Sequence, residues 1–273
     1  MIKRGDNVFR KLFFCCFASA LAACLLLCGC NNKSAQNTDD LPTLTIGSDI
    51  YKPYFYMDDV YVGIDIDIAT QACKRIGMKA VFKQIPWQDK DEYLKSGEVD
   101  CLWGSFSMNG REDKYNWAGP YMHSRQVVIV PKSSDIYKLS DLNGKNIAVQ
   151  NSSKPEELFL NHKVKEVKNI KNVYSFSNMS KVFSALKNGY VDACAGHENA
   201  YKSYMKQQIA DYRILNEPLL TADLGVAFYK DNHSQYIQKL SKALAEMRKD
   251  GTIAEILKSY GIDSEKALEE VSE

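Results

Sequence analysis

Eight cysteines are the side chains of this sequence with the widest choice of chemistry, since a thiol can form a disulfide, bind a metal or carry a modification. Five of them lie within the first thirty residues, and only Cys73, Cys101 and Cys194 lie in the body of the chain. Eight cysteines in a secreted protein suggest a disulfide framework, but this crowding argues against one. We expect the three in the body to be reduced thiols of the core.

Acid–base and metal chemistry have few candidates. The histidines show no spacing typical of metal ligands, and the chain has neither a phosphate-binding loop nor a nucleophile elbow. His197, followed directly by Glu198, is the one pair that could transfer protons. The sequence therefore predicts no cofactor and no metal, and it offers little support for catalysis.

The N-terminal residues have the pattern of an export signal. Four basic residues occur within the first eleven positions, before an uncharged and mostly apolar run over 12–28. This run is slightly shorter than the roughly 20 residues that a membrane-spanning helix needs. A basic flank before it and small residues at its end predict a cleaved signal over 1–29.

The end of this signal resembles the lipobox of bacterial lipoproteins, which reads here Leu27-Cys28-Gly29-Cys30. The resemblance implies that Cys30 is acylated and becomes the mature N-terminus. Residues 30–42 are polar without a hydrophobic period, so we expect a flexible tether. The predicted location is the extracytoplasmic face of the cell membrane, with the chain held there by lipid.

Composition and charge narrow the class of protein. With 45% apolar and 25% charged residues, the chain is typical of a soluble globular protein. Removing residues 1–29 takes four basic residues from 35 and one acidic residue from 34, which leaves a net charge of −2. This balance gives no general attraction to nucleic acid, so we exclude nucleic acid as a partner.

The remaining chain alternates between strand and helix patterns, which predicts an α/β fold. Apolar residues recur at helical spacing over 64–76 and stop at Gly77. The segment 94–100 is echoed by 186–192, and in both a helix pattern ends at a glycine before an aspartate. This echo indicates that one αβ unit is used twice.

Two lobes follow from this repeat. Apolar runs at Gln126–Val130 and Leu220–Ala227 predict two strands that cross between them. We expect lobe 1 to comprise 43–130 and 225–273, and lobe 2 to comprise 131–224. A cleft between two lobes is a favoured place for a small ligand, and hinge closure is its usual motion.

The motifs of 43–262, in their order and spacing, resemble the bacterial extracellular solute-binding proteins of family 3. The segments that carry the likeness are 44–49, 63–69, 94–100, Arg111 ahead of 117–121, 139–145, 185–193 and 225–228. The resemblance implies a two-lobed periplasmic-binding-protein-like fold of type II. It also implies a monomer that captures an amino acid and delivers it to the permease of an ABC transporter.

The resemblance assigns a carboxylate site. Arg111 matches the family's carboxylate-binding arginine, whose guanidinium can hold both oxygens of a carboxylate. Beside it, Ser107 or Ser105 could supply a hydroxyl and Gly104 a backbone group. From the second lobe, Ser152 or Ser153 is expected to cap a helix whose free N–H groups also meet the carboxylate.

The ammonium site departs from the family pattern, because His197 stands where the family usually has an aspartate. We expect Glu198 to take the ammonium group, with Asp49 or a different kind of ligand as the alternatives. His197 remains a candidate for the pocket wall.

Aromatic residues are expected to surround the ligand side chain, as the family usually has them there. The candidates are Tyr51, Tyr54, Trp87 and Trp103. Two other functions stay open, namely an enzyme of the dehydratase kind on the same fold and a sensory ligand-binding module.

Overall fold

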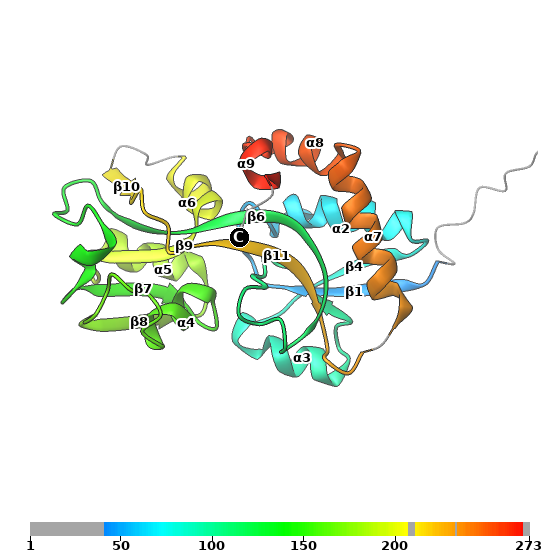
Figure 1. Cartoon of the computed structure of the whole chain (residues 1–273), viewed down its shortest axis with the longest axis horizontal. Coiled ribbons are helices and arrows are strands. Elements are labelled where there is room, and N and C mark those ends of the chain that lie inside the picture. Colours follow the sequence, from blue (N-terminus) through cyan, green and yellow to red (C-terminus); the bar gives the residue numbers. More distant parts are fainter. Residues whose placement is uncertain (1–40, 207–210, 233, 270–273) are drawn as a thin grey trace, which may run out of the picture. The chain divides into compact units, whose positions relative to one another are not determined.

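A nine-stranded mixed sheet is the framework of the protein (Figure 1). The computed structural model describes residues 41–206, 211–232 and 234–269. The predicted signal, the acylated Cys30 and the tether up to residue 40 lie outside the described residues. Within the described part, the strand order is β4-β1-β5-β11-β6-β9-β7-β8, and β10 also pairs with β6.

Two parallel sets of strands form the ends of this sheet. The strands of the first set are β1 (Thr43–Ser48), β4 (Lys79–Gln84) and β5 (Cys101–Leu102). Those of the second set are β7 (Asn146–Gln150), β8 (Asn172–Phe176) and β9 (Ala193–His197). The predicted α/β architecture is therefore present, with one parallel set on each side.

Two long antiparallel strands, β6 (Asn116–Pro131) and β11 (Leu220–Phe228), pair with each other between the parallel sets (Figure 1). Both strands were predicted, but β6 begins ten residues before the predicted start at Gln126. The stretch before Gln126 contains Gly119 and Pro120, residue types that are unfavourable inside a strand. The register of the pair shifts between Leu224 and Val226.

Helices pack against each parallel set. Beside the first set are α2 (Ile64–Arg75), α3 (Lys90–Ser96), α7 (Gln235–Lys249), α8 (Thr252–Ser259) and α9 (Ser264–Leu268). Beside the second set are α4 (Lys154–Leu160), α5 (Met179–Lys187) and α6 (Glu198–Met205). Short elements complete the chain: the hairpin β2 (Tyr56–Asp58) and β3 (Val60–Val62), strand β10 (Tyr212–Ile214), and 3-10 turns at Trp87–Asp89 and Leu139–Leu142. We call the first parallel set with its helices the first group, and the second parallel set with its helices the second group.

The sequence echo corresponds to a repeated structural unit. Asp100, after α3, accepts a hydrogen bond at 2.7 Å from the backbone N–H of Thr45 in β1. Asp192, after α5, accepts one at 2.7 Å from the backbone N–H of Asn146 in β7. In both units the aspartate thus joins the end of a helix to the first residues of the neighbouring parallel strand.

The core is continuous across the crossing strands. One cluster of buried apolar side chains extends from Ile46 in the first group to Val182 in the second. Residues 41–273 accordingly form one compact unit, and the lobe boundaries given above stay a prediction. Cys73, Cys101 and Cys194 are buried and free, as predicted. Among the described helices, none has the length and apolar character needed to cross a membrane.

Candidate functional site

A pocket lies between the two groups, at the carboxyl ends of the parallel strands of both. It is lined by the segments after β1, β4, β5 and β7, by the end of β9 and by Gln126 of β6. Parallel strands end at one edge of a sheet, and their loops there form the usual crevice for a ligand in α/β proteins. Two such edges face each other here.

Ten of the thirteen predicted ligand-binding residues line this pocket. They are Asp49, Tyr51, Trp87, Gly104, Ser105, Ser107, Arg111, Ser152, Ser153 and His197. Tyr54, Trp103 and Glu198 do not line it. That the ten bind a ligand stays a prediction, but the structure brings them into one cavity from five separate segments.

The loop that carries Arg111 is fixed by backbone pairing to β11. Met108 donates its N–H to the carbonyl of Asp223 at 2.8 Å, and Gly225 donates its own to the carbonyl of Phe106 at 3.0 Å. Gly225 is at the register shift of β11, and a Cβ there would lie 2.6 Å from the Met108 sulfur. The loop after β5 is thus attached to a strand that crosses between the groups.

The Arg111 side chain is largely buried, with 11% exposed, and burial lowers its pKa. One terminal nitrogen, Nη1, donates to the carbonyl of Ser107 at 3.3 Å, and the other, Nη2, is 3.1 Å from Glu157 Oε2. The guanidinium carbon lies 5.2 Å from the ring centre of Phe106. An aromatic ring therefore lies beside the guanidinium, in addition to the serines expected there.

Helix α4 begins as predicted, with Ser153 as its N-cap. Ser153 Oγ accepts a hydrogen bond from the N–H of Glu156 at 3.3 Å. The N–H of Ser152 donates to Glu156 Oε2 at 2.6 Å. The expectation that free N–H groups here meet a ligand is therefore not met by Ser152, because Glu156 already occupies its N–H.

Asp49 is a buried carboxylate in the wall of the pocket, with 7% of its surface exposed. Burial raises its pKa to about 6, although the hydrogen bond that it accepts from the Gln150 amide acts to lower that pKa. Asp49 comes from the first group and Gln150 from the second, so this bond also joins the two. A cation in the pocket would lower the free-energy cost of keeping Asp49 ionised.

His197 is buried, and burial lowers its pKa to about 3, so the ring is neutral at physiological pH. Its Nε2 lies 2.8 Å from the amide nitrogen of Gln126, and its Nδ1 lies 2.9 Å from Ser124 Oγ. An amide nitrogen donates, so Nε2 accepts and Nδ1 donates. Gln126 Oε1 has no hydrogen-bond partner among the described residues, although its atom is buried.

The prediction that Glu198 takes a ligand's ammonium group is not supported by its position. Its carboxylate is 3.0 Å from Arg125 and 2.7 Å from Lys202, in a separate groove. Adjacent residues at the end of a strand point to opposite sides, so His197 and Glu198 face different cavities. His197 and Glu198 were also the one predicted acid–base pair, and this geometry places the two side chains apart.

Two of the four predicted aromatic wall residues are also elsewhere. Trp103 is fully buried in the core, with its ring centre 5.7 Å from that of Tyr121. The Tyr54 hydroxyl is 3.0 Å from Ser124 Oγ and accepts from Asn199 at 3.2 Å, behind His197. Tyr51 and Trp87 remain as walls, and the Tyr51 hydroxyl accepts the N–H of His197 at 3.2 Å.

Several pocket residues were not predicted from the sequence. They are Phe106, Gln126, Gln150, Lys154, Pro155, Met179, Ala195 and Gly196. A glutamine in or at the end of an apolar strand gives no periodic signal, although one polar residue in such a run was a usable hint. Within the described part of the chain, no cluster of three or more histidine, cysteine or acidic residues could hold a metal.

Residues 44–263 match the model of the bacterial extracellular solute-binding proteins, family 3. The chain belongs to this family. It is 29% identical to the L-cystine-binding protein TcyA of Bacillus subtilis, over 91% of this chain and 95% of that protein. Such a match along almost the full length supports one shared architecture.

Solved structures of amino-acid-binding proteins share the fold of this chain. An ancestral arginine-binding protein bound to arginine superposes with a TM-score of 0.70 at 31% identity, over 80% of this chain and 97% of that one. The substrate-binding protein of an ABC uptake transporter from Streptococcus pneumoniae, with bound histidine, gives 0.74 at 26% identity, over 81% and 94%. The fold is the periplasmic-binding-protein fold, and these three relatives are binding proteins rather than enzymes.

Proposed function

We propose that this chain is the substrate-binding protein of an ABC transporter and that it captures an amino acid in the pocket described above. The observation that carries the proposal is the presence of opposite charges in one cavity, with Arg111 and Asp49 both in its wall. A free amino acid has a carboxylate and an ammonium group, so it needs both. Relatives named for cystine, arginine and histidine binding support this class of ligand.

Arg111 is the proposed partner of the ligand carboxylate. A guanidinium offers parallel N–H groups to both oxygens of a carboxylate, and in a largely buried pocket such a contact is strong. Ser107 lies beside it, with its Oγ 3.4 Å from the Gln126 amide nitrogen. Ser107 lines the same pocket, and its hydroxyl is the proposed second donor to the carboxylate.

Asp49 is the proposed partner of the ammonium group, in place of Glu198. Its buried carboxylate lacks a cation within hydrogen-bond reach among the described residues, and an ammonium group would supply one. Gln126 Oε1, buried and unpaired, is a second acceptor in the same wall. A buried acceptor without a donor costs about 1–3 kcal/mol, which a ligand N–H would recover.

Hinge closure is the proposed mode of capture. The pocket is lined from both groups, and only β6 and β11 carry the chain from one group to the other within the described residues. Bending of these two strands would open and close the pocket, and the closed protein would then be presented to the permease.

Calorimetry tests the proposed function directly. Residues 31–273, which contain the whole compact unit, would be titrated with the common amino acids and L-cystine. We expect one of them to bind, and Arg111→Ala to weaken its binding by about 2–5 kcal/mol. Arg75→Ala, which removes an arginine paired with Asp250 outside the pocket, should leave the affinity unchanged. Absence of binding by every amino acid would refute the proposal.

We further propose that the mature protein is anchored to the membrane by acylation of Cys30. The support is the lipobox-like sequence around Cys30 and the export signal before it. Cells fed labelled palmitate should label the wild type but not Cys30→Ala, and the variant should leave the membrane fraction. Equal labelling of both proteins would show that the lipid is absent from Cys30.

A further inference from the structure

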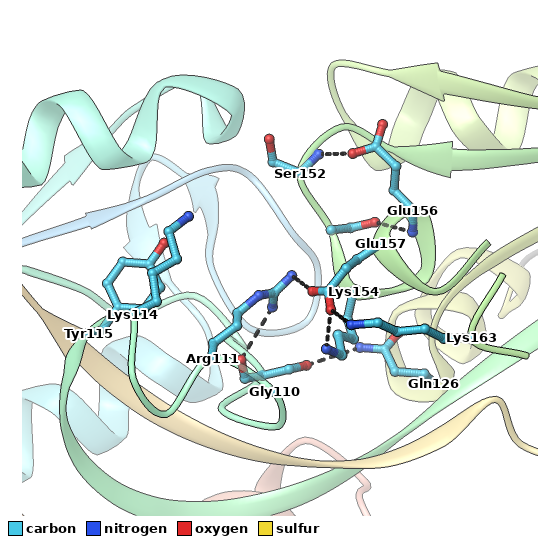
Figure 2. Close-up of polar contacts among 12 residues, drawn as sticks. Gly110, Arg111, Lys114, Tyr115, Gln126, Ser152, Lys154, Glu156, Glu157 and Lys163 are labelled. Atoms are coloured by element: carbon cyan, nitrogen blue, oxygen red, sulfur yellow. Dashed lines mark hydrogen bonds and ion pairs between the residues drawn. The ribbon is translucent and has the colours of Figure 1, made fainter. Parts of the chain in front are cut away.

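Glu157 is the centre of a charged cluster beside the pocket (Figure 2). Its Oε2 is 3.1 Å from Arg111 Nη2, while its Oε1 accepts from Lys154 at 2.8 Å and from Lys163 at 3.0 Å. Burial raises the pKa of Glu157, but the hydrogen bonds from the two lysines outweigh it and hold that pKa below its usual range. Glu157 is therefore ionised at neutral pH.

Glu157 is the counter-charge of the guanidinium that a ligand carboxylate would need. Nη1 of Arg111 is engaged by the carbonyl of Ser107, and Nη2 faces Glu157. Each terminal nitrogen has a second N–H, but a ligand carboxylate that binds there meets a cation whose charge Glu157 already offsets. The two carboxylates compete for one cation.

If a ligand carboxylate took over Arg111, Glu157 would keep two cations. Lys154 is on the same helix, and Lys163 follows the helix by three residues, so both remain within reach after Arg111 is released. Three cations surround one carboxylate in this cluster, and Lys154 and Arg111 are largely buried. The resulting excess of positive charge favours the entry of a second carboxylate.

We propose that Glu157 is an internal stand-in for the ligand carboxylate. It neutralises Arg111 in the ligand-free protein, and it releases Arg111 when a carboxylate ligand enters, so that this residue sets the affinity of the pocket. The inference rests on the proposed function, because it requires a ligand whose carboxylate binds Arg111. It assigns a role to a residue that does not itself line the pocket.

The decisive variant is Glu157→Gln, which keeps the shape of the side chain and removes its charge. The control is Glu166→Gln, which removes the same charge from an exposed position in the loop after α4. The probe is the tightest binder among L-cystine, L-histidine and L-arginine, measured by calorimetry. We expect Glu157→Gln to bind it about tenfold more tightly than the wild type, and Glu166→Gln to bind it equally.

An affinity of Glu157→Gln that is unchanged or weaker overturns the inference, since Glu157 would then position Arg111 rather than compete with the ligand. If the wild type binds none of the three probes, the proposed function fails instead.

Thermal unfolding without ligand gives an independent measurement. In Glu157→Gln the buried cations Arg111 and Lys154 lose a counter-charge, so its melting temperature should be roughly 2–4 °C below that of Glu166→Gln. The binding probe should then raise the melting temperature of Glu157→Gln by more than it raises that of the wild type. Equal melting temperatures of the two ligand-free variants also overturn the inference.

Discussion

Burial determines the charge of the polar residues in the pocket. His197 is neutral because burial lowers its pKa to about 3, whereas Asp49 loses its proton only above about pH 6. The position where the family usually has a charged aspartate therefore holds a neutral ring, and the negative charge comes from the opposite group. In the proposed site, the ligand's cation is therefore held by the wall of the first group rather than by that of the second.

Asp49→Asn should separate stability from binding. The pKa of Asp49 is higher in the folded protein than its ordinary value of 3.8, so the ionised group costs stability above pH 6, and this cost disappears as the pH falls toward 4. Asparagine can accept the same hydrogen bond from Gln150. We expect the ligand-free variant to gain about 1–3 kcal/mol at pH 8 and almost nothing at pH 4, measured by urea unfolding.

The same variant should bind the amino-acid ligand at least about tenfold more weakly at pH 8, because its ammonium group loses a charged partner. Asp135→Asn, at a side chain with 81% exposure, serves as the control and should change neither quantity. A variant that binds as tightly as the wild type would place the ligand's cation elsewhere.

The sequence located the pocket better than it located the contacts within it. The segments around Arg111 and Ser153 were predictable because loop and cap residues have a local pattern. Glu198 was misplaced because neighbours in sequence at the end of a strand face opposite sides. Gln126 and Gln150 were missed because a single amide in an apolar strand acquires its role only from the chain packed against it.

The start of helix α2 shows how one backbone position holds a wall of the pocket. Gly63 has φ of 137°, and a Cβ there would lie 2.2 Å from the carbonyl oxygen of Tyr54. The next residue, Ile64, donates its N–H to Pro53 at 3.0 Å, so the 51–55 turn is packed directly on the helix start. That turn carries Tyr51 into the pocket.

Gly63→Ala should therefore be much more harmful than an ordinary glycine substitution. We expect a loss of more than about 3 kcal/mol in the free energy of unfolding, because the methyl group must displace backbone. Gly77→Ala, at φ of 73° with open space around the added methyl group, should cost only about 1–2 kcal/mol. Urea denaturation of both variants measures the difference, and equal losses would contradict this account of the helix start.

The molecule as a whole keeps its thiols out of reach. Burial raises the pKa of Cys73 to about 12 and also raises the pKa values of Cys101 and Cys194. Residues 31–273 contain only these three cysteines. The repeated αβ unit and both crossing strands were predictable from local patterns. The continuous core that buries the three thiols was not, because it forms only when the sheet is assembled.

Native residues 31–273 should accordingly react very slowly with a thiol reagent such as Ellman's reagent, because thiolate is scarce and access requires unfolding. In concentrated urea, three thiols per chain should react at once. Rapid reaction of even one thiol in the native protein would show an opening of the core that does not require global unfolding.

The pairing of β6 with β11 has a consequence for how such proteins diversify. The chain enters the second group through one of these strands and returns through its hydrogen-bonded neighbour. Gln126 pairs with Leu220, so residues 127–219 are a single insert whose two ends lie side by side. Genetic recombination at these two places would exchange Gln150, Ser153 and His197 together while leaving Arg111 and Asp49 in place. Half of the residues that line the pocket are therefore inheritable as one cassette. If they bind the ligand as proposed, a library of chimaeras with relatives would change selectivity without rebuilding the scaffold.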